Sequence, residues 1–160
     1  CAELLQMAKE SRISTAVDTS GMVPWQSIAK VMPFTDLFLY DIKLIDPELH
    51  RKYTGASNVI ILDNLRHLDK CGSPIEVRIP LIPKVNTDDK FIEMVGTVLS
   101  TIDNLRAVKV LPYNPYARAK YASLERANEM PENITTTRDD IDRIVRYLLT
   151  LGLNARTDQD

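Results

Sequence analysis

The most chemically capable side chains of this 160-residue sequence lie in or just after the last residues of four short apolar segments. In chain order they are Asp18, Thr19, Ser20, Asp41, Lys43, Arg78 and Asn114. If the apolar segments are parallel strands, their carboxyl ends meet at one edge of a sheet, where α/β proteins carry their working residues. The sequence therefore predicts one polar site built from the ends of four strands.

The residue types of this predicted site favour a small ligand that carries both charges. Asp18 and Asp41 end consecutive strands, and two carboxylates at short range repel each other unless a cation joins them. We expect that companion to be a bound cation or the neighbouring Lys43. Lys43 and Arg78 offer donors for a ligand carboxylate, and arginine can bind one with two parallel hydrogen bonds. An amino acid, or a derivative of one, meets these requirements.

Each of these residues also has a structural interpretation that the sequence leaves open. Asp18 precedes Thr-Ser-Gly and could cap a turn. Asp41 and Lys43 could form a half-buried ion pair, and Arg78 could satisfy backbone carbonyls or a nearby carboxylate. Asn114 stands between Tyr and Pro, where a turn residue is equally expected.

The elements that must position these side chains alternate between strands and helices. Apolar patterns predict strands at 13–18, 37–42, 75–82 and 107–111, and helices at 24–32, 46–55, 59–71, 88–102 and 137–152. The unbroken apolar segment 37–42 predicts a strand covered on both faces. His50 falls on a predicted helix away from the strand ends, and we expect it to pack that helix rather than bind a ligand.

This βα order predicts an α/β fold with a parallel sheet and right-handed crossovers, a partial TIM-like barrel of about four βα units. Four units cannot close into a barrel. The helical pattern starts directly at Cys1, so we expect a single domain over 1–160 that lacks upstream strands. The 25 residues after the fourth strand form a loop of a length that is usually functional.

Composition excludes several classes of function. Hydrophobic residues make up 44% and charged residues 26%, with a net charge of −2, so neither nucleic acid nor an anionic membrane is an expected partner. No apolar run approaches the roughly 20 residues that span a bilayer. Two cysteines, Cys1 and Cys71, are too few for a disulfide framework. We predict a cytoplasmic protein.

Five blocks of the sequence, in order, resemble the glycyl-radical-enzyme activating enzymes, the pyruvate formate-lyase-activating enzyme family of the radical S-adenosylmethionine (radical SAM) superfamily. The blocks are TAVDTSG at 15–21, DLFLYDIK at 36–43, HRKYTG at 50–55 with Asn58, VRIPLIP at 77–83, and LPYN at 111–114 with AKY at 119–121. Each block alone is weak evidence, whereas five in order are strong. The resemblance runs over about residues 1–153.

This resemblance implies a (β/α)6 partial barrel, a [4Fe–4S] cluster with one open iron, and S-adenosylmethionine bound to that iron. Reductive cleavage would give a 5′-deoxyadenosyl radical, which removes hydrogen from a glycine of a partner glycyl-radical enzyme such as pyruvate formate-lyase. A reduced flavodoxin or ferredoxin, and anaerobic life, are implied as well. The cofactor carries the difficult chemistry, and the protein supplies position and electrostatics.

The resemblance also implies roles for single residues. Asp18, Thr19 and Asp41, with the backbone carbonyl of Leu39, would form a site for a monovalent cation beside the carboxylate of the ligand. Together with these side chains, three further residues would hold S-adenosylmethionine itself, namely Lys43, Arg78 and Asn114. Asn114 stands where some members of the family have histidine.

The sequence departs from the family in two respects. The Cys-x3-Cys-x2-Cys cluster loop and the Gly-Gly-Glu stretch are not in the chain, and Cys1 and Cys71 cannot replace the loop, so the chain alone is expected to be inactive as an activating enzyme. Lys84 stands where the family usually has glycine, so that turn is expected to differ.

Two other interpretations stay open at this point. One is a truncated or degenerate homologue that binds a ligand or partner without catalysis. The other is an aldolase-like enzyme in which Lys43, beside Asp41 at the end of an apolar strand, forms a Schiff base with a carbonyl substrate.

Overall fold

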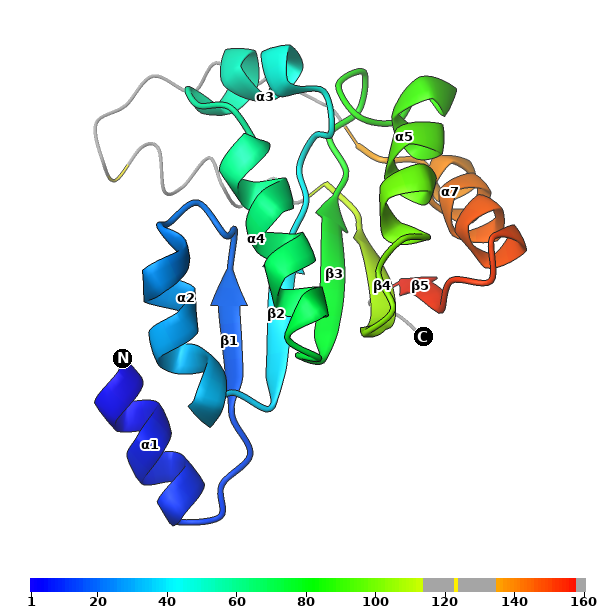
Figure 1. Cartoon of the computed structure of the whole chain (residues 1–160). Coiled ribbons are helices and arrows are strands. Elements are labelled where there is room, and N and C mark those ends of the chain that lie inside the picture. The colour runs from blue at the N-terminus through cyan, green and yellow to red at the C-terminus, as the bar shows by residue number, and fades with distance from the viewer. Residues whose placement is uncertain (114–122, 124–134, 158–160) are drawn as a thin grey trace.

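Five parallel strands form one sheet, in the order β1-β2-β3-β4-β5, in the computed structural model, which describes residues 1–113, 123 and 135–157 (Figure 1). The strands are β1 (Ala16–Thr19), β2 (Leu37–Asp41), β3 (Ile75–Pro80), β4 (Leu105–Leu111) and β5 (Ala155–Thr157). The helices are α1 (Ala2–Glu10), α2 (Trp25–Val31), the 3-10 helix η1 (Met32–Phe34), α3 (Pro47–Thr54), α4 (Val59–Lys70), α5 (Asp89–Leu99) and α7 (Arg138–Thr150). The predicted α/β class with a parallel sheet is confirmed.

The connecting helices α2, α4 and α5 cover one face of the sheet (Figure 1). With strands in sequential order, right-handed crossovers place every such helix on the same side. Phe38, Tyr40, Val77 and Val108 point to that side and are fully buried. Their neighbours along β2 are only partly buried, in strict alternation. The prediction that 37–42 is covered on both faces is therefore wrong: its apolar character reflects one helix-covered face and one half-open face.

The ends of α3 form as the sequence predicts. Asp46 caps the helix, since its Oδ1 accepts hydrogen bonds from the backbone N–H groups of Glu48 and Leu49 at 2.9 and 3.0 Å. Gly55 ends the helix in the left-handed conformation, with φ +84°. These local signals fix where α3 lies relative to the end of β2.

The sequence missed β5, which adds a fifth strand next to β4 through the pair Val108–Ala155. A segment of three residues is too short to show an alternating pattern, so its strand character comes only from pairing with β4. Two other helix starts agree with expectation: Asp88 caps α5 and Thr137 caps α7.

The loop after β3 keeps the backbone that glycine favours, although its residue is Lys84. Lys84 has φ +65°, in the left-handed region that costs a non-glycine residue roughly 1–2 kcal/mol. Asn86, fully buried, holds the loop: its Nδ2 donates to the carbonyls of Lys43 at 2.9 Å and Pro80 at 2.8 Å. The loop is thus fixed to the ends of both β2 and β3, and these hydrogen bonds offset the strain at Lys84.

Gly21 closes the turn after β1 against a buried tyrosine. It has φ +69°, and a Cβ atom there would lie 1.7 Å from the hydroxyl oxygen of Tyr40. That hydroxyl donates to the carbonyl of Ile61 at 2.7 Å, and the Asn64 Nδ2 donates to the carbonyl of Gly21 at 2.8 Å. The end of β1 is thereby joined to α4, which leaves no room for a side chain at residue 21.

We predict that Gly21→Ala lowers the free energy of unfolding by about 3 kcal/mol, because left-handed strain and overpacking against Tyr40 add. Gly55→Ala is the matched control: it has a similar φ but no atom within 4 Å of the added Cβ, so about 1 kcal/mol is expected. Urea denaturation of both variants measures the difference. Equal losses in the two variants would contradict the packing argument.

Candidate ligand-binding site

Arg78 on β3 joins the two carboxylates that the sequence places at the strand ends. Its Nε and Nη2 lie 3.0 and 2.8 Å from Oδ1 of Asp41, and its Nη2 also forms an ion pair with Asp18. The sequence predicted a bound cation or Lys43 as the companion of these carboxylates. The guanidinium of Arg78 pairs with both carboxylates, and the predicted Lys43 pairs with Asp41 as well.

Strand register explains why these three residues meet. Asp41 and Arg78 are direct neighbours on β2 and β3, and Asp18 pairs with Leu39, two residues before Asp41. Residues in register, and residues two apart on a strand, share a face of the sheet. All three side chains therefore lie on the face that the helices do not cover.

Burial and charge act in opposite directions on Arg78. Partial burial would lower the pKa of its guanidinium, but the hydrogen bond with Asp18 and the charge of Asp41 outweigh that effect and raise the pKa above its ordinary value. Arg78 is thus a permanent cation. Its side chain is 19% exposed, whereas that of Asp18 is 62% exposed, so the network has a partly buried centre and an open rim.

Lys43 extends the network toward a pocket. Its Nζ lies 3.3 Å from Oδ2 of Asp41, whereas Arg78 donates to the other carboxylate oxygen, Oδ1. The pocket has a volume of about 220 Å³ and includes Asp41 and Lys43 in its wall. The remaining lining residues are Ser20, Met22, His50, Thr54, Ala56 and Ile61. A ligand in this pocket would meet one ammonium, one carboxylate, and a wall of mixed apolar and neutral polar side chains.

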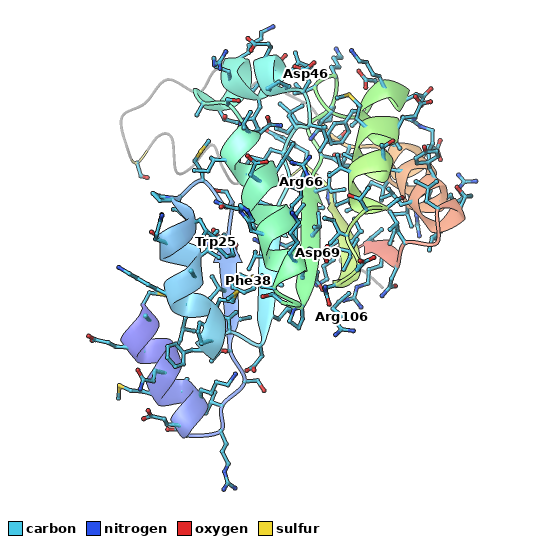
Figure 2. All side chains as sticks on the ribbon, viewed as in Figure 1. Trp25, Phe38, Asp46, Arg66, Asp69 and Arg106 are labelled. Carbon is cyan, nitrogen blue, oxygen red and sulfur yellow. The ribbon has the colours of Figure 1, made fainter. Side chains whose placement is uncertain are left out.

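The pocket lies at the carboxyl edge of the sheet, as the sequence predicts. Figure 2 labels Asp46, at the start of α3, on the edge where the pocket-lining helix lies, and Asp69 and Arg106 at the opposite edge. At that opposite edge the Asp69 carboxylate accepts hydrogen bonds from Asn104, with Oδ1 2.8 Å from the Asn104 backbone nitrogen. The Asp18–Arg78–Asp41–Lys43 network and the Asp69–Asn104 contacts therefore lie at opposite ends of the strands.

Not every predicted site residue joins this network. Thr19 is in register with the buried Tyr40, and its hydroxyl accepts a hydrogen bond from the backbone N–H of Gly21 at 2.9 Å. Leu39 shares the open face with Asp18. Asn114 lies outside the described residues. Within the described part of the chain, no group of three or more His, Cys, Asp or Glu side chains converges on a metal position.

His50 lies at the pocket, contrary to the expectation that it stands away from the strand ends. It is buried, with 3% of its surface exposed, and lines the same pocket as Asp41 and Lys43. The connection between β2 and α3 is short, so the helix lies over the strand end, a tertiary relation that helical periodicity does not reveal.

A second ion-pair cluster on the open face was also missed. Glu76 on β3 has a side chain only 8% exposed, and it pairs with Arg156 at 3.0 Å and with Lys109 at 3.6 Å. Lys109 and Arg156 are in register with Arg78, on β4 and β5. Charged residues thus cross the open face from β1 to β5, each paired with an opposite charge on that face.

Comparison with known proteins identifies the relatives of this chain. The trans-4-hydroxy-L-proline dehydratase activating enzyme of Clostridioides difficile is 36% identical over 155 residues, which cover 96% of this chain and 51% of that protein. The pyruvate formate-lyase-activating enzyme of Streptococcus mutans is 33% identical over 127 residues, 76% of this chain and 48% of that protein. No family profile matches the chain. The chain spans about half the length of the curated relatives it matches.

Solved structures agree with this relationship. A domain of a pyruvate-formate lyase-activating enzyme from Bacteroides vulgatus superposes with a TM-score of 0.81 at 25% identity, covering 98% of this chain and 88% of that domain. The S-adenosylmethionine-bound SuiB of Streptococcus suis shares the fold alone, with a TM-score of 0.71 at 11% identity over 98% of this chain and 33% of SuiB. The fold is therefore that of a radical SAM partial barrel.

Sequence identity assigns the chain to one family within this fold class. Activating enzymes for several different enzymes match the chain at 31–36% identity. The chain belongs to the family of glycyl-radical-enzyme activating enzymes, and its resemblance to that family is confirmed.

We predict that Arg78→Met lowers the free energy of unfolding by about 1–2 kcal/mol, because two carboxylates on adjacent strands lose the cation between them. Arg78→Lys should lose less, since it keeps the charge but not the planar fork. Asp18→Asn, at the exposed rim, should change stability by less than about 0.5 kcal/mol. Urea denaturation at pH 7 and low salt measures the free energy of unfolding of the three variants. If Arg78→Met unfolded at the same urea concentration as the wild type, the central role of Arg78 would be contradicted.

Proposed function

We propose that this chain binds the amino-acid end of S-adenosylmethionine in an enzyme that activates a glycyl-radical enzyme. The observation that carries the proposal is the Arg78–Asp41–Lys43 network beside the pocket at the carboxyl edge. Family membership supports it, because the relatives are activating enzymes by name.

Lys43 is the residue best placed to bind the ligand carboxylate. Its ammonium has three donors, one of which is directed to Asp41, and the side chain is 39% exposed beside the pocket. The Nε and Nη2 atoms of Arg78 are paired with the carboxylates of Asp41 and Asp18. We therefore propose that Arg78 is a positioning residue: it orients Asp41, and Asp41 in turn orients Lys43. Asn114 stays a predicted ligand contact outside the described residues.

The monovalent cation stays a prediction. Carboxylate, hydroxyl and carbonyl oxygens are suitable ligands for a hard cation, and Asp18, Thr19, Asp41 and the Leu39 carbonyl would provide them. Such a cation would share both carboxylates with Arg78. The Thr19 hydroxyl would bind it while accepting a hydrogen bond from Gly21. Of these four proposed cation ligands, the two carboxylates have more support from the geometry than the Thr19 hydroxyl and the Leu39 carbonyl.

The residues of this chain do not fit the [4Fe–4S] cluster that the family uses together with S-adenosylmethionine. Such clusters are held by cysteine thiolates. The chain has two cysteines, both exposed: Cys1 at the start of α1 and Cys71 at the end of α4. We therefore assign no electron-transfer or radical-forming step to residues of this chain; its own part is to bind and orient the ligand.

The partners of the whole enzyme follow as proposals from the family. A glycyl-radical enzyme would be the protein substrate, with pyruvate formate-lyase as the default, since relatives serve several different enzymes. Reduced flavodoxin or ferredoxin would donate the electron, under anaerobic conditions in the cytoplasm. Neither nucleic acid nor a membrane is proposed as a partner. No helix in the described ranges is long and apolar enough to cross a membrane.

The Schiff-base alternative has less support. Attack on a carbonyl needs a neutral amine, whereas Lys43 is an ammonium paired with the Asp41 carboxylate. The alternative of a non-catalytic binding homologue agrees with the same pocket, and it differs from our proposal only in what the whole protein does with the ligand.

The proposal is tested by binding of S-adenosylmethionine to the 160-residue chain in isothermal titration calorimetry. We expect Lys43→Met to weaken binding about 10- to 100-fold, the effect of losing one charge-assisted hydrogen bond. Lys70→Met is the matched control, because Lys70 is exposed at the far end of α4 and should leave affinity unchanged. Equal affinities for the two variants would contradict a role for Lys43.

We also predict that anaerobic reconstitution of this chain with iron and sulfide yields no protein-bound cluster, because its two exposed cysteines flank different helices, Cys1 before α1 and Cys71 after α4. Visible absorbance after gel filtration, with iron and sulfide analysis, measures the outcome. Cys1→Ala and Cys71→Ala variants should behave like the wild type. A stable cluster chromophore that either substitution removes would show that these cysteines do ligate iron.

A further inference from the structure

Helix α3 buries a histidine and nothing else. His50 is its one buried residue, at 3% exposure, while apolar side chains such as Leu49 and Tyr53 are 39% and 47% exposed. A surface helix normally buries an apolar stripe. A buried imidazole loses its hydrogen bonds to water, so it needs hydrogen bonds within the protein to offset that cost.

Those hydrogen bonds fix the tautomer of His50. Its Nδ1 lies 2.6 Å from the carbonyl oxygen of Ala56, which can only accept, so Nδ1 carries a hydrogen. The Thr54 hydroxyl lies 2.9 Å from the same nitrogen and donates to the His50 carbonyl at 2.8 Å. In the neutral ring Nε2 is therefore an acceptor, held in a fixed direction by its own helix end.

Nε2 of His50 has no partner within the described part of the chain. The space that His50 lines is the pocket of about 220 Å³ that also contains Asp41 and Lys43. An oriented acceptor thus lies on the same pocket wall as the ammonium of Lys43.

The other histidine shows the contrast. His67 on α4 is exposed and its ring lies 5.1 Å from the ring of Trp25, a contact between two helices on the covered side of the sheet. It has no place in the pocket. His67 is therefore a built-in reference for measurements that report on histidine rings.

We propose that His50 is a ligand-binding residue of this site, whose Nε2 accepts a hydrogen bond from an N–H or O–H group of the ligand that Lys43 binds by its carboxylate. This inference rests on the proposed function. Two parts of S-adenosylmethionine carry such a donor: the ammonium of the amino-acid end, and the hydroxyl and amino groups of the adenosyl end. His50 recognises the donor, and the experiment distinguishes the two sources.

The test uses the 160-residue chain with 15N-labelled histidine, because the 15N signal of Nε2 distinguishes a free acceptor from one that accepts a hydrogen bond. S-Adenosylmethionine, methionine and 5′-methylthioadenosine are added in turn. We expect S-adenosylmethionine to shift the Nε2 signal of His50 and leave that of His67 in place. A shift by methionine assigns the donor to the ammonium, and a shift by 5′-methylthioadenosine assigns it to the adenosyl end.

Two substitutions separate binding from folding. In His50→Asn the amide can replace Nδ1 as donor to Ala56 but does not reach the position of Nε2, so the fold should persist and the affinity for S-adenosylmethionine should fall about 3- to 10-fold, as for one neutral hydrogen bond. His50→Gln, whose amide extends further, should recover part of the affinity. Circular dichroism and urea denaturation monitor the fold of both variants.

The outcomes separate this inference from the proposed function. Binding to the wild type with an unmoved Nε2 signal, and equal affinity in His50→Asn, would overturn the role of His50 and leave the Lys43 site standing. No saturable binding of any of the three compounds to the wild type would overturn both. A shifted Nε2 signal with weakened binding in His50→Asn supports both.

Discussion

A guanidinium between two carboxylates determines the arrangement of the carboxyl edge of this sheet. Asp18 and Asp41 stand on adjacent strands, on the same face, and Arg78 forms an ion pair with each of them. Arg78 contacts one oxygen of Asp41 through two nitrogens. The other oxygen is left to orient Lys43, so the direction of the Lys43 ammonium depends on Arg78 through Asp41.

That network exists because the crossover helices of the described residues cover one side of the sheet and leave the strands' other face to charged side chains. The sequential strand order sends every crossover helix to one face, where the core lies, and leaves the other face for charged side chains. Charges on this face are satisfied across strands: Glu76 is almost buried, but it has two cationic neighbours, Lys109 and Arg156. A face closed by a second layer of helices would have had to bury these groups with the full cost of desolvation.

The sequence predicted those features that local chemistry determines. The ends of α3 follow from Asp46 and Gly55, and the order of strands and helices follows from apolar spacing. The predicted site residues Asp41, Lys43 and Arg78 do meet, because carboxyl ends of parallel strands must converge. Which of these pairings form was not predictable, since a sequence without register cannot show that Arg78 reaches the carboxylates of both Asp41 and Asp18.

Features that depend on pairing or on tertiary distance were missed for the same reason. The strand β5 has three residues and acquires its character only from β4. The partial exposure of Leu39 depends on which face the helices take, which a continuous apolar segment does not reveal.

The position of His50 combines local and tertiary causes. Its helix begins six residues after the end of β2, with Asn58 donating to the carbonyls of Leu44 and Ile45 at 2.8 and 2.7 Å and so holding the connection in place. The same block of sequence, from His50 through Thr54 to Asn58, supplies the ring, the hydroxyl beside its Nδ1 and the amide that anchors the loop. One short block of sequence therefore determines both the orientation of the His50 ring and the position of its helix. Both are needed, because the ring lines the pocket only when α3 lies at the end of β2.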